Sequence, residues 1–201
     1  MEKKLQYFIF LLITCSICYA KNVQLGSQLK TFEQTLAAAD LQFIFPKEFR
    51  EINTIQHSNV SVNYAMELPK ADFQVWFSVK NLQQEWSKFK ASEDESKHAL
   101  INPDSLYSAT SLSAAIALAG KDNYTSKNLP QEVLNNFHAD KGKSYQLNLY
   151  NASATGHYQY GLLVCLQKSG TGYISMLFLS NENGPDFYKK VNKAYYSVKF
   201  N

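Results

Sequence analysis

The sequence predicts a mixed α/β fold of the α+β type, a three-layer α/β/α sandwich around a central, mainly antiparallel sheet. Two observations predict it. Several segments alternate apolar and polar residues and are joined by short turns, which is typical of antiparallel strands. Two later strand segments, residues 158–167 and 172–180, are instead apolar on both faces, so helices must cover both faces of the sheet.

A hairpin precedes this pair in the sequence. Residues 59–68 and 73–80 both alternate, and Pro69 with three following residues supplies the turn between them. The alternation places five residues on one face of the first strand: Val60, Val62, Tyr64, Met66 and Leu68. Further strands are expected at residues 41–45, where Pro46 ends the run, and at residues 144–150.

The clearest helix is predicted over residues 103–119. Asn102 is a suitable N-cap, Pro103 suits the first helical position, and Gly120 suits a left-handed C-terminal position. Shorter helices are expected at residues 130–139 and after Gly184-Pro185, and a weak one within residues 21–39. Residues 81–101 are polar, so a solvated helical turn or loop is expected there.

The composition narrows the classes of function that this protein can have. The 201 residues are 45% apolar, which permits a sizeable core and argues against disorder. A net charge of +3 with scattered lysines, and Arg50 as the only arginine, argues against a nucleic-acid partner.

The first twenty residues read as a secretory signal peptide. Lys3 and Lys4 precede an apolar run, and Cys18-Tyr19-Ala20 suits cleavage after Ala20. The competing interpretation is a lipoprotein signal. We expect a secreted or periplasmic chain without a transmembrane span, consisting of a lead segment at 21–39 and a single domain at 40–201.

Three residues are candidate binding residues. Trp76 occupies the strand face otherwise lined by Gln74 and Ser78, so it is either an exposed anchor or covered by the 103–119 helix. His138 and Asp140 could act together on a ligand, although a histidine at a helix C-terminus also simply favours the helix dipole.

No catalytic, metal or cofactor motif emerges from the sequence. The histidines lack the i, i+4 spacing of a helical zinc site, and no phosphate-binding or dinucleotide glycine loop occurs. Cys165 lies within an apolar strand, so we expect a buried, unreactive thiol.

Several segments together resemble a known group of proteins. The strand LQFIFP, the hairpin NYAMELP…FQVWFSV and the segment LPQEVLNNFHADKGKSYQLNLY before YGLLVCLQKSGTGYISMLFLS resemble bacterial exported proteins of PsbP-like fold. That fold also occurs in an extrinsic photosystem II protein and a Ran-binding nuclear import factor. The resemblance implies an α/β/α sandwich but no shared active site, because these proteins have different partners.

The sequence therefore predicts an exported, non-enzymatic protein that binds a protein partner or an envelope component. The alternative is a small-molecule-binding protein or a hydrolase whose site is assembled from distant residues. A closed pocket with convergent polar groups would favour the alternative, and an aromatic patch would favour binding.

Overall fold

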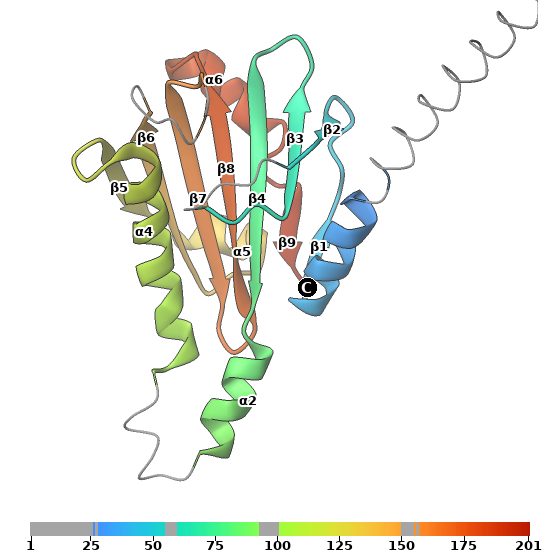
Figure 1. Cartoon of the computed structure of the whole chain (residues 1–201), viewed down its shortest axis with the longest axis vertical. Coiled ribbons are helices and arrows are strands. Elements are labelled where there is room, and N and C mark those ends of the chain that lie inside the picture. Colours follow the sequence, from blue (N-terminus) through green and yellow to red (C-terminus); the bar gives the residue numbers. More distant parts are fainter. Residues whose placement is uncertain (1–25, 27, 55–59, 93–100, 150–154, 156) are drawn as a thin grey trace, which may run out of the picture.

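The computed structural model describes residues 26, 28–54, 60–92, 101–149, 155 and 157–201. The predicted signal peptide lies outside these residues. The described chain has a mixed α/β fold built on a large antiparallel sheet (Figure 1). The strands of this sheet are β2 (Arg50–Ile52), β3 (Tyr64–Leu68), β4 (Phe73–Asn81), β5 (Tyr124–Asn128), β6 (Lys141–Asn148), β7 (Tyr160–Lys168) and β8 (Gly172–Ser180).

The strand order in the sheet is β2-β3-β4-β8-β7-β6-β5, and every neighbouring pair is antiparallel. The predicted hairpin is β3–β4, and the predicted pair of two-sided strands is β7–β8. These two strands are buried almost throughout, because each lies between neighbours and has an apolar cluster on both faces.

A second, two-stranded sheet joins the two ends of the domain. In it β1 (Leu41–Phe43) pairs antiparallel with β9 (Val198–Phe200), and the Ile44 amide donates to the Ser197 carbonyl at 2.8 Å. The strand expected at residues 41–45 therefore forms, but it is shorter and outside the main sheet. Leu41 and Phe200 are both buried, so this pair packs on the core.

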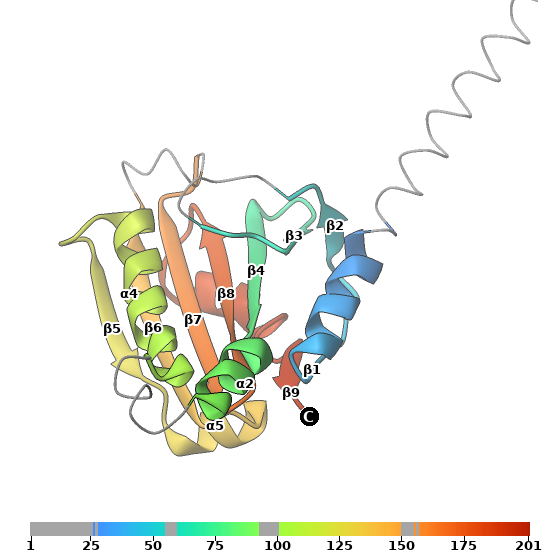
Figure 2. The same ribbon diagram turned by 60° about the horizontal axis from the view of Figure 1, so that its bottom comes forward.

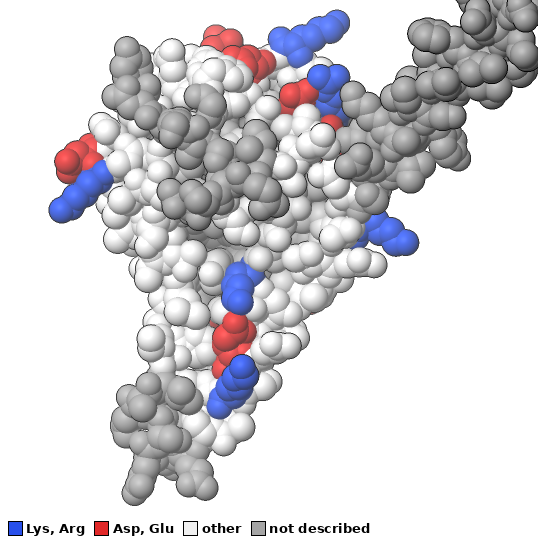
Figure 3. Space-filling model, in the orientation of Figure 1, with Lys and Arg blue, Asp and Glu red and all other residues white. Residues whose placement is uncertain are grey.

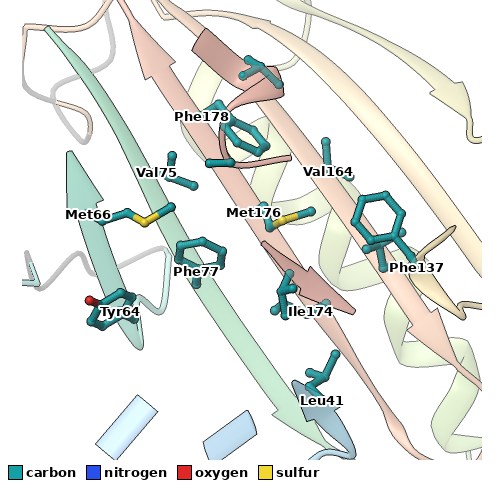
Figure 4. Packing of buried hydrophobic residues seen from close by; sticks show 14 of the residues in the cluster. Leu41, Tyr64, Met66, Val75, Phe77, Phe137, Val164, Ile174, Met176 and Phe178 are labelled. Carbon is teal, nitrogen blue, oxygen red and sulfur yellow. The ribbon is translucent and has the colours of Figure 1, made fainter. Parts of the chain in front are cut away.

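The larger apolar cluster lies on one face of the main sheet. Alternate residues of β3, β4, β8 and β7 point into it, among them Tyr64, Phe77, Met176 and Val164 (Figure 4). A helix that includes residues 28–38 packs there through Phe32 and Leu36, as do α5 (Gln131–Phe137) and α6 (Gly184–Asn192).

The smaller apolar cluster lies on the opposite face, where α4 (Leu106–Ala119) packs against β5, β6 and β7 (Figures 1 and 2). The predicted ends of this helix are confirmed. The Asn102 side chain accepts the Asp104 amide at 2.9 Å, a short 3-10 turn η1 (Pro103–Ser105) follows, and Gly120 ends the helix at φ 84°.

The polar stretch after β4 contains a regular helix. α2 (Gln83–Ala91) forms where a solvated helical turn or loop was expected, and it extends beyond one end of the sheet (Figure 1). The two apolar marks of the stretch, Trp86 and Phe89, pack edge to face on this helix with ring centroids 5.5 Å apart.

The predicted strand at residues 59–68 is wrong in its first half. Only Tyr64 to Leu68 join the sheet, while Val60 and Val62 pack against the smaller cluster on the opposite face from Tyr64. The cause lies at Asn63, whose side-chain oxygen accepts the Val79 amide at 2.7 Å while its own amide donates to the Phe77 carbonyl. The Asn63 side chain supplies the acceptor that a backbone carbonyl of residue 61 or 62 would otherwise provide for the Val79 amide. The chain can therefore leave the sheet at this point.

β6 begins at Lys141, earlier than the expected start at residue 144, and the helix expected after Gly184-Pro185 is α6. β2, β5 and β9 were not predicted. None of the helices in the described ranges is long and apolar enough to cross a membrane.

Candidate functional site

Trp76 is buried on the face of the main sheet that carries the smaller apolar cluster. Its side chain is 3% exposed, it pairs across the sheet with Ala65 and Leu177, and its indole Nε1 donates to Gln74 Oε1 at 3.0 Å. The small Ala65 leaves room beside the indole ring. The Trp76 side chain is therefore buried rather than exposed.

The cover over Trp76 differs from the one expected. α4 lies over β5–β7 rather than over β4, and its buried side is fixed there by two hydrogen bonds. The Tyr107 hydroxyl donates to the Cys165 carbonyl at 3.2 Å, and the hydroxyls of Ser111 and Tyr145 are 3.0 Å apart. Burial also raises the pKa of Tyr107, so this hydroxyl stays protonated as a donor.

On the other side of Trp76, the segment at residues 60–62 folds over the sheet. Val60 and Val62 pack against the smaller cluster, as the bond between Asn63 and Val79 requires. Trp76 thus lies between α4 and this segment.

The space between them is a groove of about 240 Å³, which we call the Trp76 groove. Figure 3 views the face of the sheet on which α4 lies, and most of the described side chains on this face are uncharged. Apolar side chains form most of the groove: Val60, Val62, Trp76, Ala114, Leu163 and Leu177. Hydroxyl groups line the remainder: Ser61, Ser78, Thr110, Ser113, Tyr173 and Ser175.

One cation lies among the lining residues. Lys80 contributes to the groove and its ammonium is 2.9 Å from Glu85 Oε1 on α2. The hydrogen bond from Lys80 lowers the pKa of Glu85, so this carboxyl group is ionised at neutral pH. None of the described residues that line the groove is a histidine or a carboxylic acid, which are the usual general acids and bases.

Cys165 lies beneath the groove on β7. The thiol is fully buried, it accepts a hydrogen bond from the Ser175 hydroxyl at 3.3 Å, and burial raises its pKa to about 12. A thiolate is the reactive form of cysteine, so this side chain serves packing, as the sequence predicted.

His138 and Asp140 lie far from the Trp76 groove in the fold, because they follow α5 on the other face of the sheet. His138 ends α5 in the left-handed conformation, at φ 52°. Asp140 accepts the Ser169 amide at 2.8 Å in the turn between β7 and β8. Both side chains are exposed, and each position has a structural explanation of this kind.

A polar cluster that the sequence did not predict joins three distant segments. Asp72, in the turn between β3 and β4, lies 2.7 Å from His157 Nε2 and accepts a hydrogen bond from the Asn181 amide at 2.6 Å. The His157 hydrogen bond lowers the pKa of Asp72. Residues so far apart in sequence give no local signal. Both partners of the His157–Asp72 contact are exposed, so it is a surface contact rather than an enclosed acid–base site.

The described part of the chain contains no cluster of side chains that could bind a metal ion. No group of three or more His, Cys, Asp or Glu side chains lies close enough together there to hold an ion. The Trp76 groove is thus the feature in which a sequence-predicted residue and a cavity coincide.

Comparisons with known proteins give no family for this chain. No protein-family model matches the sequence, and a search of curated proteins finds no match. Its function must be inferred from the site itself.

Proposed function

We propose that this chain is an exported, non-enzymatic binding protein that holds an apolar side chain of a protein partner in the Trp76 groove. The proposal includes a signal peptide at residues 1–20 and a three-layer α/β/α sandwich of the PsbP-like type. The observation that carries it is the groove itself: a rigid aromatic floor, apolar walls and a rim of hydroxyl groups.

The chemistry of the lining supports binding over catalysis. Val60, Val62 and Ala114 are half-buried and offer apolar surface, and burying such surface against a partner releases about 25 cal/mol per Å². The hydroxyls at the rim can bond to the backbone of an extended partner segment. Such an apolar centre with a polar rim is the usual anatomy of a protein interface.

The size of the groove favours a side chain over a small molecule. At about 240 Å³ it is smaller than the roughly 300–1,000 Å³ of typical small-molecule pockets. A Leu, Met or Phe side chain presented by a partner fits such a volume. Anchors of this kind in a desolvated pocket provide most of the energy of many protein interfaces.

Selection from a displayed peptide library tests the proposal without knowledge of the natural partner. The matched variants are Ala114→Phe, which fills the groove, and Ala109→Phe, which adds the same ring on the exposed side of α4. We expect peptides with one large apolar residue to be enriched on the wild type and on Ala109→Phe, and to be lost on Ala114→Phe. Enrichment of the same peptides on both variants would contradict the proposal, as would a library that yields no binders.

A further inference from the structure

A second groove lies on the opposite face of the sheet, next to α6. It has a volume of about 230 Å³ and lies between α6 and the outer strands β5 and β6. Thr125 and Lys127 on β5 stand opposite Gln146 and Ser144 on β6 in the strand register. Four polar side chains therefore form a compact array on one sheet face.

α6 forms the other wall of this groove. Phe187 and Val191 are buried and fix the helix on the sheet, so Tyr188 and Asn192, four residues apart, share the side of the helix that faces the groove. Tyr188 is 39% exposed, and its hydroxyl oxygen accepts a hydrogen bond from Gln146 Nε2 at 2.5 Å. An aromatic ring is thus held in a fixed position at the entrance.

The hydrogen bonds leave the groove rich in donors. Gln146 is oriented at both ends, because its Oε1 accepts from the Thr125 hydroxyl at 3.3 Å. Since Tyr188 accepts from Gln146, its own hydroxyl hydrogen is available to a ligand. The lining includes no carboxylate among the described residues, and Lys127 has no ion-pair partner among them.

We propose that this groove binds an acidic sugar residue, with the carboxylate on Lys127 and the ring against Tyr188. A sugar ring presents hydroxyls that can both donate and accept, which suits the amides of Gln146 and Asn192. Its C–H faces suit an aromatic ring and the apolar side chain of Leu162. An inorganic anion would use Lys127 but leave the aromatic ring and Leu162 without a role.

This inference is independent of the proposed function, because the two grooves lie on opposite faces of the sheet. Trp76 belongs to the smaller apolar cluster, whereas Leu162 and Val191 belong to the larger one. Failure of either proposal leaves the other unaffected.

The test is a nitrogen-15 NMR titration with trigalacturonate, with its uncharged methyl ester as the matched ligand. We expect shifts confined to the amides around Thr125, Lys127, Gln146 and Asn192, with a Kd of about 1 mM or tighter. The ester should bind more weakly, and added salt should weaken only the acid.

Two variants and one control test which side chains contact the ligand. Lys127→Ala should weaken trigalacturonate about three- to fivefold and leave the ester unchanged. Lys143→Ala, on the other face of the same edge, where its ammonium lies 5.5 Å from the Tyr145 ring, should change neither ligand. Tyr188→Phe keeps the ring and removes the acceptor of Gln146, so it should weaken both ligands alike.

Two results would overturn the proposal. One is a titration in which the amides of the groove do not shift with either ligand. The other is equal binding of acid and ester together with no effect of Lys127→Ala, because the carboxylate would then have no recognised partner. Lys127 is exposed, so its replacement leaves folding intact and keeps the test decisive.

Discussion

Asp104 and Asp140 bind successive amide groups of the same tight turn. Asp140 Oδ2 accepts the Ser169 amide at 2.8 Å, and Asp104 Oδ1 accepts the Gly170 amide at 3.2 Å. Asp104 belongs to η1 before α4, whereas Asp140 follows α5. The turn between β7 and β8 is therefore held by segments that pack on opposite faces of the sheet.

Removal of either carboxylate should destabilise the fold. Asp104→Ala and Asp140→Ala should each lower the free energy of unfolding by about 1 kcal/mol, because each leaves a turn amide without its acceptor. Asp104→Ala should cost more, since its carboxylate also accepts the Trp86 indole at 3.1 Å. Urea unfolding measures both. Asp122→Ala is the control, an exposed side chain without a partner among the described residues; an equal loss there would contradict this role.

The side chain of Asn63 should control the exit of the chain from the sheet. Asn63→Ala removes the acceptor of the Val79 amide, so that amide should exchange its hydrogen faster and stability should fall by about 1 kcal/mol. Asn63→Asp keeps an oxygen at this position and should preserve protection of the amide. Unchanged exchange at Val79 in the alanine variant would show that another group satisfies it.

Asn63 also explains why only the second half of the strand predicted at residues 59–68 joins the sheet. The apolar alternation runs without a break from Val60 to Leu68, so period alone predicts a single strand face. The chain changes face at Asn63 because the Asn63 side chain, rather than a backbone carbonyl, accepts the Val79 amide. No local sequence pattern predicts this change of acceptor. The pattern does predict β4, β7 and β8, which lie in the middle of the sheet between the two apolar clusters.

The edge strand β5 was missed for a different reason. Tyr124 is half-buried and the other four residues of β5 are exposed, so no apolar period exists to detect. The same limit applies to the Trp76 groove. Trp76 stands out in sequence because it interrupts a polar strand face, but Val60 and Ala114 join it only through the fold.

Cys165 should resist modification in the folded protein. Burial raises the pKa of its thiol to about 12, so almost none is ionised at pH 8. A thiol reagent in native buffer should react far more slowly than with free cysteine, at a rate set by opening of the fold. Addition of denaturant should restore rapid reaction. Rapid native labelling would contradict the burial of β7.

The Asp72–His157 contact should give a measurable acid dependence of stability. The pKa of Asp72 is lowered in the folded state, chiefly by the hydrogen bond from His157. Its contribution is therefore present above the ordinary aspartate pKa of about 4 and is lost as pH falls through the lowered folded value. The stability of wild type relative to Asp72→Asn should thus decrease below about pH 4. A difference that is independent of pH would contradict this assignment, and Asp122→Asn serves as the control.

The fluorescence of Trp76 tests the central claim most directly. The chain has two tryptophans, so Trp86→Phe leaves Trp76 as the only reporter, on the floor of the groove. Titration of this protein with a selected peptide should change the Trp76 emission. In that background, Ala114→Phe should weaken binding at least about tenfold, equivalent to about 1.4 kcal/mol, whereas Ala109→Phe should leave the Kd unchanged. Equal affinity of both variants, with constant Trp76 emission on binding, would contradict the Trp76 groove as the binding site.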